Sequence, residues 1–394
     1  MASKLLTFKR TVAVSAEQVF YAFTNALSLS EWLCDFAYVN LSAGNRLYCQ
    51  WRDGRARMGR YVTLTPAKKV VLDWRGDEEE DVSQVTVTIS EKEDSSTVTL
   101  TETSESKGWA KRAAEAEAFW NAALDNLVST LESGFDLRTK RRPYLGLDVA
   151  VHQNSEPGAA VTGVEPESPA HAAGLQAGDV ITALGSDRVS DQPTLEAALY
   201  KHSAGDKVKI TYLRDGKKLA ANVVLAAATE TEVPESHEVL AEIVARKYTE
   251  VNRDLTQALK GVSDERAARA PAPGRWSARQ VLAHLVESER HLHHWLTCLI
   301  AGEVVLPENP PSGRRERLDA VINGFPTVQA LLTELKRNEA ETVALLNALP
   351  PAFLARRASY RRMAEVMLTW PDHARQHLEE IKYAIRNVKV VETW

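Results

Sequence analysis

Apolar and polar residues alternate over short stretches in the first third of the chain. Residues 5–14, LLTFKRTVAV, begin this pattern, which is typical of a half-buried β-strand. Ser15 and Gln18 have the spacing of a capping box, which predicts that a helix starts there. Apolar residues at three- and four-residue spacing predict a second helix over 109–131. Between the helices, apolar runs separated by turn-rich segments predict strands at 46–51, 59–64, 69–74, 82–89 and 97–103.

The pattern changes twice further along the chain. A basic stretch at 138–142 and an acidic stretch at 229–236, which contains Pro234, indicate linkers on either side of a second unit. Within that unit, Asp215-Gly216 stands between apolar runs, which is typical of a tight hairpin turn. The chain is therefore expected to contain three domains, over 1–137, 143–228 and 234–394.

The third unit follows a helical period. Its apolar faces predict four helices. The first covers 237–259, and the second starts at a capping box formed by Ser277 and Gln280. The third follows the turn NGFP at 323–326 and ends at Leu349, and the fourth covers 363–385. Pro371 either kinks the fourth helix or marks a later start. A Pro-rich crossover at 307–311 joins the second helix to the third, which favours a four-helix bundle with one long connection.

Composition narrows the classes of function. The chain has 394 residues with 48 Lys and Arg against 53 Asp and Glu, a net charge of −5, so its charge does not favour nucleic acid as a partner. Three scattered cysteines, Cys34, Cys49 and Cys298, indicate reduced thiols rather than a disulfide framework. The start lacks a signal-peptide pattern, and no apolar run approaches the ~20 residues that span a bilayer. We therefore expect a cytoplasmic protein with no membrane span.

Four short motifs mark the first unit: SAEQVFYAFT at 15–24, EWL at 31–33, GRY at 59–61 and VVLDW at 70–74. Together they resemble the START/SRPBCC superfamily, specifically bacterial homologues of the heat-shock-ATPase activator, although a Gly-Gly pair common in that family is Ala43-Gly44 here. The resemblance implies a helix-grip antiparallel sheet that binds an apolar small molecule or a client in some members. Four indoles either line such a cavity or form plain core: Trp32, Trp51, Trp74 and Trp120.

Five motifs mark the second unit: YLGL at 144–147, SPA at 168–170, AGL at 173–175, AGDVI at 177–181 and LRDGK at 213–217. Together they resemble a PDZ domain of the bacterial protease-associated type, a small β-barrel-like fold. The resemblance implies that a protein C-terminal peptide adds to the sheet edge, with its carboxylate on the backbone N–H groups of Tyr144, Leu145, Gly146 and Leu147. Gly146 lacks the Cβ that would block this approach. The alternative is a PDZ domain that docks only against its own neighbouring domains.

Two histidines in the third unit are four residues apart. His373 and His377 would leave one face of the predicted fourth helix about one turn apart, which lets two imidazoles reach one metal ion. A third imidazole from a facing helix would complete a site with an open position, as catalytic sites have. Histidines at this spacing also occur on helix surfaces. No sequence position identifies a catalytic residue such as a general base.

The surrounding motifs favour the metal site. WSARQVLAHL at 276–285, Glu289-Arg290 and DHARQHL at 372–378 resemble the DinB/YfiT-like family, which has a four-helix bundle and a three-histidine metal site. The resemblance implies that a divalent metal ion binds His284, His373 and His377; zinc, nickel, manganese and iron all tolerate imidazole. Members of this family often dimerise, which leaves a homodimer open.

Other polar groups of the second helix could support such a site. We expect Glu287, Glu289 and His291 to surround the ligands, with ordinary surface charge as the alternative for the two carboxylates. His293 and His294 are expected at the surface, and Cys298 in the core.

Two functions remain open from the sequence. In the first, the chain is a metal-dependent enzyme that transfers a thiol to a small molecule or hydrolyses one, and the other two domains supply targeting or regulation. In the second, the chain is an adaptor or stress-related scaffold that binds protein C-termini and apolar ligands, and its metal site is structural or vestigial.

Overall fold

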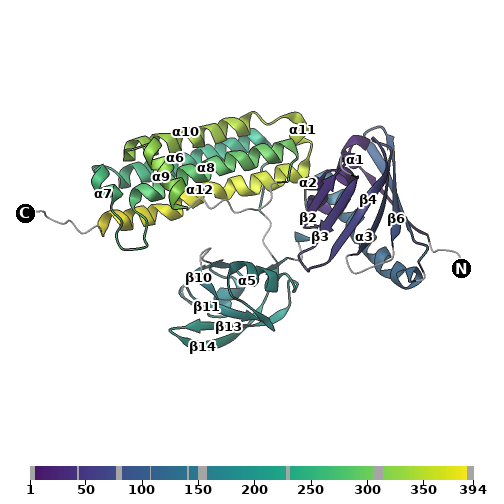
Figure 1. The fold of residues 1–394 in the computed structure, drawn as a ribbon, viewed down its shortest axis with the longest axis horizontal. Coiled ribbons are helices and arrows are strands. Elements are labelled where there is room, and N and C mark those ends of the chain that lie inside the picture. The colour runs from purple at the N-terminus through teal and green to yellow at the C-terminus, as the bar shows by residue number, and fades with distance from the viewer. Residues whose placement is uncertain are drawn as a thin grey trace, which may run out of the picture. The chain divides into compact units, whose positions relative to one another are not determined.

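The computed structural model describes residues 5–41, 44–76, 82–106, 108–139, 142–149, 158–227, 231–304 and 314–387. The chain divides into two compact units, Met1–Glu230 and Thr231–Trp394. Figure 1 shows the helices and strands of each part. The predicted crossover at 307–311, the middle of the first linker at 140–141, the end of the second domain at 228, the first residues of the second linker at 229–230 and Ala43 lie outside the described residues.

A seven-stranded antiparallel sheet forms the first domain, in the order β1-β7-β6-β5-β4-β3-β2. The strands are β1 (Leu6–Val12), β2 (Phe36–Asn40), β3 (Arg46–Gln50), β4 (Ala56–Thr65), β5 (Lys69–Gly76), β6 (Ser83–Lys92) and β7 (Ser95–Thr103). The helices are α1 (Ala16–Thr24), α2 (Ala26–Trp32) and the long α3 (Trp109–Ser133). The capping box at Ser15 and Gln18 is confirmed. The sequence pattern did not predict β2 or α2.

Indole rings fill the core of this domain. Trp32, Trp51, Trp74 and Trp120 all belong to one cluster of buried side chains. Trp74 and Trp120 stack with their centroids 5.2 Å apart, and both donate their N–H groups to the buried carboxylate of Glu102, at 3.1 and 2.7 Å. These tryptophans therefore support the helix-grip core itself.

The second domain is a small sheet flanked by short helices. Its main strands run in the order β14-β13-β11-β10-β9, so that β9 lies at an edge, and β12 (Asp187–Arg188) pairs with β11. The elements are β9 (Leu147–Val149), β10 (Ala159–Val164), β11 (Val180–Leu184), β13 (Lys207–Arg214), β14 (Lys217–Val224), α4 (Pro169–Ala172) and α5 (Gln192–Leu199). A separate ribbon pairs β8 (Pro143–Tyr144) with β15 (Ala226–Ala227). Asp215 and Gly216 both have positive φ, which confirms the tight hairpin.

Four long helices dominate the C-terminal unit (Figure 1). They are α6 (His237–Ala258), α8 (Ala278–Ala301), α10 (Val328–Asn347) and α12 (Arg357–Arg386). Shorter helices accompany them: α7 (Asp264–Ala268), α9 (Arg315–Gly324) and α11 (Pro351–Leu354). The predicted start of the last helix at 363 is wrong, because α12 begins at Arg357 and continues through Pro371. Lys247 of α6 donates a hydrogen bond to the carbonyl of Leu368, in the turn before this proline, at 2.5 Å.

Candidate metal centre

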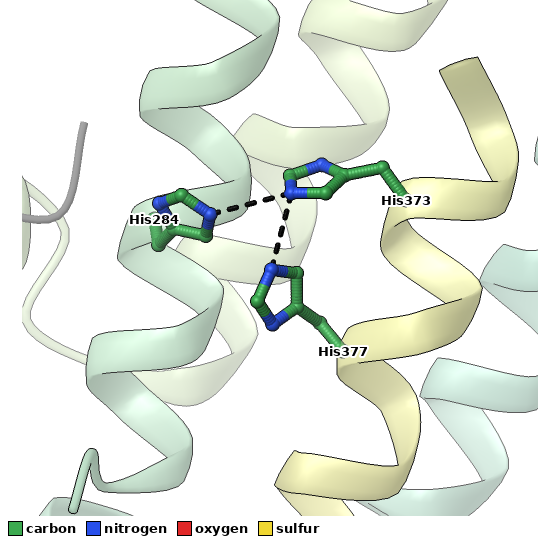
Figure 2. Close-up of side chains that lie close together, drawn as sticks. All are labelled: His284, His373 and His377. Atoms are coloured by element: carbon green, nitrogen blue, oxygen red, sulfur yellow. Dashed lines mark hydrogen bonds between the residues drawn. The ribbon is translucent and has the colours of Figure 1, made fainter. Parts of the chain in front are cut away.

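Two helices of the bundle bring three histidines together. His284 lies on α8, seven residues after Ser277, whose capping box with Gln280 fixes the start of that helix. His373 and His377 lie on α12, one turn apart. Figure 2 shows the three imidazoles pointing toward one another across the space between these helices. The structure therefore brings His284 next to the pair, and that the three residues bind a metal stays a prediction.

The distances between these rings suit one metal ion. His373 Nε2 lies 3.4 Å from His284 Nε2 and 3.1 Å from His377 Nε2. All three ligand atoms lie within 4.8 Å of one another. Two zinc–nitrogen bonds of about 2.1 Å at a tetrahedral angle place their nitrogens about 3.4 Å apart, so the donor set fits. Three protein ligands leave a fourth position for water or substrate.

Burial keeps at least one of these rings neutral. His284 is only 8% exposed. Burial, together with the neighbouring imidazoles of His377 and His284, lowers the pKa of His373 to about 3. A neutral imidazole is the form that binds a metal, so His373 is ready to act as a ligand at neutral pH.

Glu380 contacts one of the three histidines. Its Oε2 lies 3.0 Å from His377 Nδ1, the ring nitrogen that faces away from the other two histidines. This hydrogen bond lowers the pKa of Glu380, which keeps the carboxylate ionised. A carboxylate on the far nitrogen of a metal-binding histidine fixes its tautomer and raises its basicity. Sequence reasoning missed Glu380, although its three-residue spacing from His377 could have indicated it.

The carboxylates predicted around the site have other partners. Glu287 forms ion pairs with Arg290 and Arg317, at 3.0 and 2.5 Å. Glu289 accepts hydrogen bonds from neighbouring helices, among them one of 2.7 Å from Trp370. Neither carboxylate is hydrogen-bonded to the three imidazoles among the described interactions, so neither orients a ligand directly as expected.

The remaining histidines of α8 lie beyond the site. His291 follows His284 by seven residues, about 10 Å along the helix axis, and burial lowers its pKa. His293 was expected at the surface, but its Nε2 lies 2.8 Å from Thr342 Oγ1 and it is part of the interior polar network. Cys298 is half-buried and lies within 3.8 Å of the exposed His294, so the expected core position is only partly realised.

Two indoles flank the histidines. The ring of Trp276 lies 5.1 Å from that of His284, and the ring of Trp370 lies 5.8 Å from that of His373. Both indoles are partly exposed. The imidazole cluster is therefore bordered by apolar, planar surfaces, which limit access of water and can pack against a ligand.

The predicted peptide-binding loop of the second domain has a left-handed backbone at Gly146. Its φ is +74°, and a Cβ there would lie 2.2 Å from the Cβ of Ser168. Leu147 begins the edge strand β9, whereas Leu145 is buried in the domain core. Tyr144 contacts Glu165 through its hydroxyl, and burial with this contact raises the pKa of Tyr144 to about 12.

Comparison with known families assigns each of these regions. Residues 13–132 match the model of activator of Hsp90 ATPase homolog 1-like proteins, residues 143–225 match the PDZ domain, and residues 247–381 match the DinB superfamily. The chain joins an Hsp90-activator-like domain, a PDZ domain and a DinB domain. This order is the one that the sequence motifs indicate. The histidine cluster belongs to the DinB domain, whose superfamily is associated with metals.

Curated relatives share only a short stretch with this three-domain chain. The serine protease Do-like HtrA of Lactococcus lactis subsp. cremoris is 49% identical over 72 residues, which cover 18% of each chain. The periplasmic serine endoprotease DegP of Escherichia coli is 36% identical over 87 residues, which cover 22% of this chain and 18% of DegP. The chain thus spans about a fifth of the length of these relatives.

Two of the similar solved structures each align with about a third of the chain. An HSP90 activator from Plasmodium falciparum aligns with a TM-score of 0.28 at 25% identity, over 31% of this chain and 92% of its own. CalU16 from Micromonospora echinospora aligns with a TM-score of 0.27 at 19% identity, over 31% of this chain and 73% of its own. Among the described residues, no helix is long and apolar enough to cross a membrane.

Proposed function

We propose that the DinB domain binds one divalent metal ion through His284, His373 and His377 and acts as a metal-dependent enzyme on a small molecule. The convergence of three Nε2 atoms carries this proposal: that of His373 lies 3.4 Å from that of His284 and 3.1 Å from that of His377. When bound, the metal would lower the pKa of a water or thiol at its open position. Thiol transfer and hydrolysis are the two reaction classes that this chemistry favours.

Residues around the proposed metal ion have different roles. Glu380 holds the His377 ring by its Nδ1 and so directs Nε2 toward the other imidazoles. Burial keeps His373 unprotonated, which removes proton competition at that ligand. Trp276 and Trp370 present ring surfaces beside the ligands and would pack against an apolar or planar part of the substrate. Imidazole ligands alone accommodate zinc, nickel, manganese or iron.

Metal content of the full chain tests this proposal. We would purify the chain without chelator or an affinity metal and measure metals by elemental analysis, before and after incubation with zinc, nickel or manganese. We expect about one equivalent per chain, lost in the double variant His373→Ala/His377→Ala. His291→Ala, which removes an imidazole of the same bundle outside the cluster, should retain the metal. A folded chain that takes up no metal after incubation contradicts the proposal.

A second binding function is proposed for the PDZ domain. The left-handed Gly146 and the edge strand β9 support the capture of a protein C-terminus, because a peptide can pair with β9 while its carboxylate meets the loop. Binding of fluorescent peptides with a free or an amidated C-terminus tests this. A preference for the free carboxylate is expected, and equal binding of both forms contradicts carboxylate recognition.

An adaptor without enzymatic activity is the alternative for the whole chain. The Hsp90-activator-like domain and the PDZ domain are both binding modules by family, so the chain could connect a client or apolar ligand to a protein tail. The two functions differ in what the metal does. An enzyme turns over thiol-transfer or hydrolytic substrates and loses this turnover when the histidines are replaced, whereas an adaptor shows no turnover either with or without them.

A further inference from the structure

One buried carboxylate of the bundle has no part in the site described so far. Glu289 lies on α8, five residues after His284, and is 5% exposed. Tyr248 donates to its two oxygens at 3.1 and 3.2 Å, Thr342 donates at 3.2 Å, and the indole N–H of Trp370 donates at 2.7 Å. These donors come from α6, α10 and α12, so the carboxylate connects all four long helices.

Glu289 is buried at an energetic cost. Its described partners are two hydroxyls and an indole, and no ion pair joins it to a lysine, arginine or histidine within the described parts of the bundle. A buried carboxylate without a cation is expensive even when it is hydrogen-bonded. Glu287, two residues earlier, is only 1% exposed, but ion pairs with Arg290 and Arg317 neutralise its charge. Glu289 has no such ion pair among the described residues. Stability alone does not account for Glu289.

Trp370 connects this carboxylate to the histidine cluster. It precedes His373 by three residues on α12, and its ring centroid lies 5.8 Å from that of His373 with an interplanar angle of 43°. Residues three apart on a helix are neighbours on its surface. Since the indole has a single N–H donor, a hydrogen bond to Glu289 fixes the ring in one orientation against the imidazole.

We propose that Glu289 is a positioning residue of the metal centre, which holds the indole of Trp370 against the imidazole of His373. This inference rests on the proposed metal function and assigns to it a residue outside the ligand set. Among the described interactions the carboxylate forms no hydrogen bond to the three imidazoles, so we infer that its effect passes through the indole. Without that hydrogen bond, Trp370 gains rotamers and His373 loses the surface that restrains its ring.

Metal affinity separates positioning from a purely structural role. We would compare Glu289→Gln and Trp370→Phe with Glu287→Gln in the full chain, after circular dichroism has established that each is folded. Zinc affinity is measured by competition with a chromophoric chelator, and ligand geometry by the visible spectrum of the cobalt-loaded chain. The first two variants should bind zinc about tenfold more weakly and shift the cobalt bands. Glu287→Gln should lower thermal stability and leave both readouts unchanged.

Two outcomes overturn the proposal. In one, Glu289→Gln and Trp370→Phe fold and match the unmodified chain in zinc affinity and cobalt spectrum. In the other, Glu287→Gln changes both readouts as strongly as they do, which indicates a general effect of the bundle. If Glu289→Gln does not fold, Trp370→Phe decides, because it removes only the indole N–H and part of the ring while Tyr248 and Thr342 still satisfy the carboxylate.

A metal-free measurement keeps this inference separate from the proposed function. The imidazole ¹H–¹³C resonance of His373, assigned with His373→Ala, reports the environment of the ring in the absence of metal. It should shift in Glu289→Gln and Trp370→Phe and stay in place in Glu287→Gln. If the unmodified chain binds no metal, the proposed function fails, and a shift or its absence still decides whether Glu289 positions His373 through Trp370.

Discussion

His377 and Glu380 are joined by a 3.0 Å contact between Nδ1 and Oε2, on successive turns of α12. The carboxylate stabilises the tautomer in which Nε2 carries the lone pair that a metal needs. We therefore expect Glu380→Ala to weaken zinc binding by about 10–100-fold, the usual effect of removing such a partner. Chelator competition measures this loss. Glu379→Ala, which removes an exposed carboxylate paired with Lys382, should leave zinc affinity unchanged.

The interior of the bundle should make its stability depend on pH. Burial raises the pKa of Glu289 to about 7 and that of Glu339, which Asn252 contacts, to about 8. A carboxyl group whose pKa is raised by folding stabilises the fold fully below its unfolded pKa of 4.5, and this contribution is lost as the pH rises through the folded pKa. The metal-free bundle should therefore lose stability as the pH rises from about 4.5 to about 8, and the loss should level off above that.

Replacing one of these groups isolates the effect. Glu339→Gln stays neutral, so its free energy of unfolding relative to the unmodified chain should improve as the pH rises from about 4.5 to about 8. Urea titrations followed by circular dichroism at each pH measure this difference. Glu341→Gln, at a 67% exposed side chain on the same helix, should show no such trend. A difference between Glu339→Gln and the unmodified chain that is constant across this range contradicts the raised pKa.

The PDZ loop should not tolerate a side chain at Gly146. A Cβ there meets Ser168 at 2.2 Å, and the positive φ adds strain of about 1–3 kcal/mol. We expect Gly146→Ala to destabilise the PDZ domain and to reduce binding of C-terminal peptides. Gly216→Ala carries a similar φ of +72° but meets no atom within 4 Å, so it should strain the hairpin without affecting the loop. Equal peptide affinity in both variants would contradict the close approach at Gly146.

The stability of the first domain should depend on the buried carboxylate of Glu102. Trp74, Trp120 and Ser83 all donate to its carboxylate, and Glu102 is 1% exposed. Glu102→Gln keeps the volume but turns one acceptor into a donor that faces these groups. We expect a loss of about 2–3 kcal/mol of folding free energy, since buried donors are left without an acceptor. Thermal unfolding measures it, with Glu91→Gln, an exposed position on β6, as the control.

Local patterns predicted the parts of the molecule that depend on a single element. Both capping boxes and the hairpin at Asp215-Gly216 lie where the sequence indicates, because each is decided by a few adjacent residues. The pairing of His373 with His377 follows from helical spacing, and the family motif placed His284 opposite them. Only the placement of His284 depends on how two helices pack, and there the family resemblance took the place of a local pattern.

Features that depend on packing between elements were not predictable in the same way. Glu287 and Glu289 stand two residues apart on α8, about 200° around the helix, so one meets Arg317 and the other meets Trp370. Their roles depend on helices that the sequence does not orient. His293 lies in the interior because its Nε2 forms a hydrogen bond with the hydroxyl of Thr342 on α10. Pro371 stays within α12, which helix propensity alone disfavours.

The histidine cluster also connects distant parts of the chain. His284 and His373 are 89 residues apart in sequence, and α9, α10 and α11 lie between them. An ion shared by these two residues would act as a non-covalent crosslink that closes this long loop, and it would bind the folded bundle far better than the unfolded chain. Metal supply would then set how long the bundle survives unfolding and proteolysis, independently of any reaction at the site.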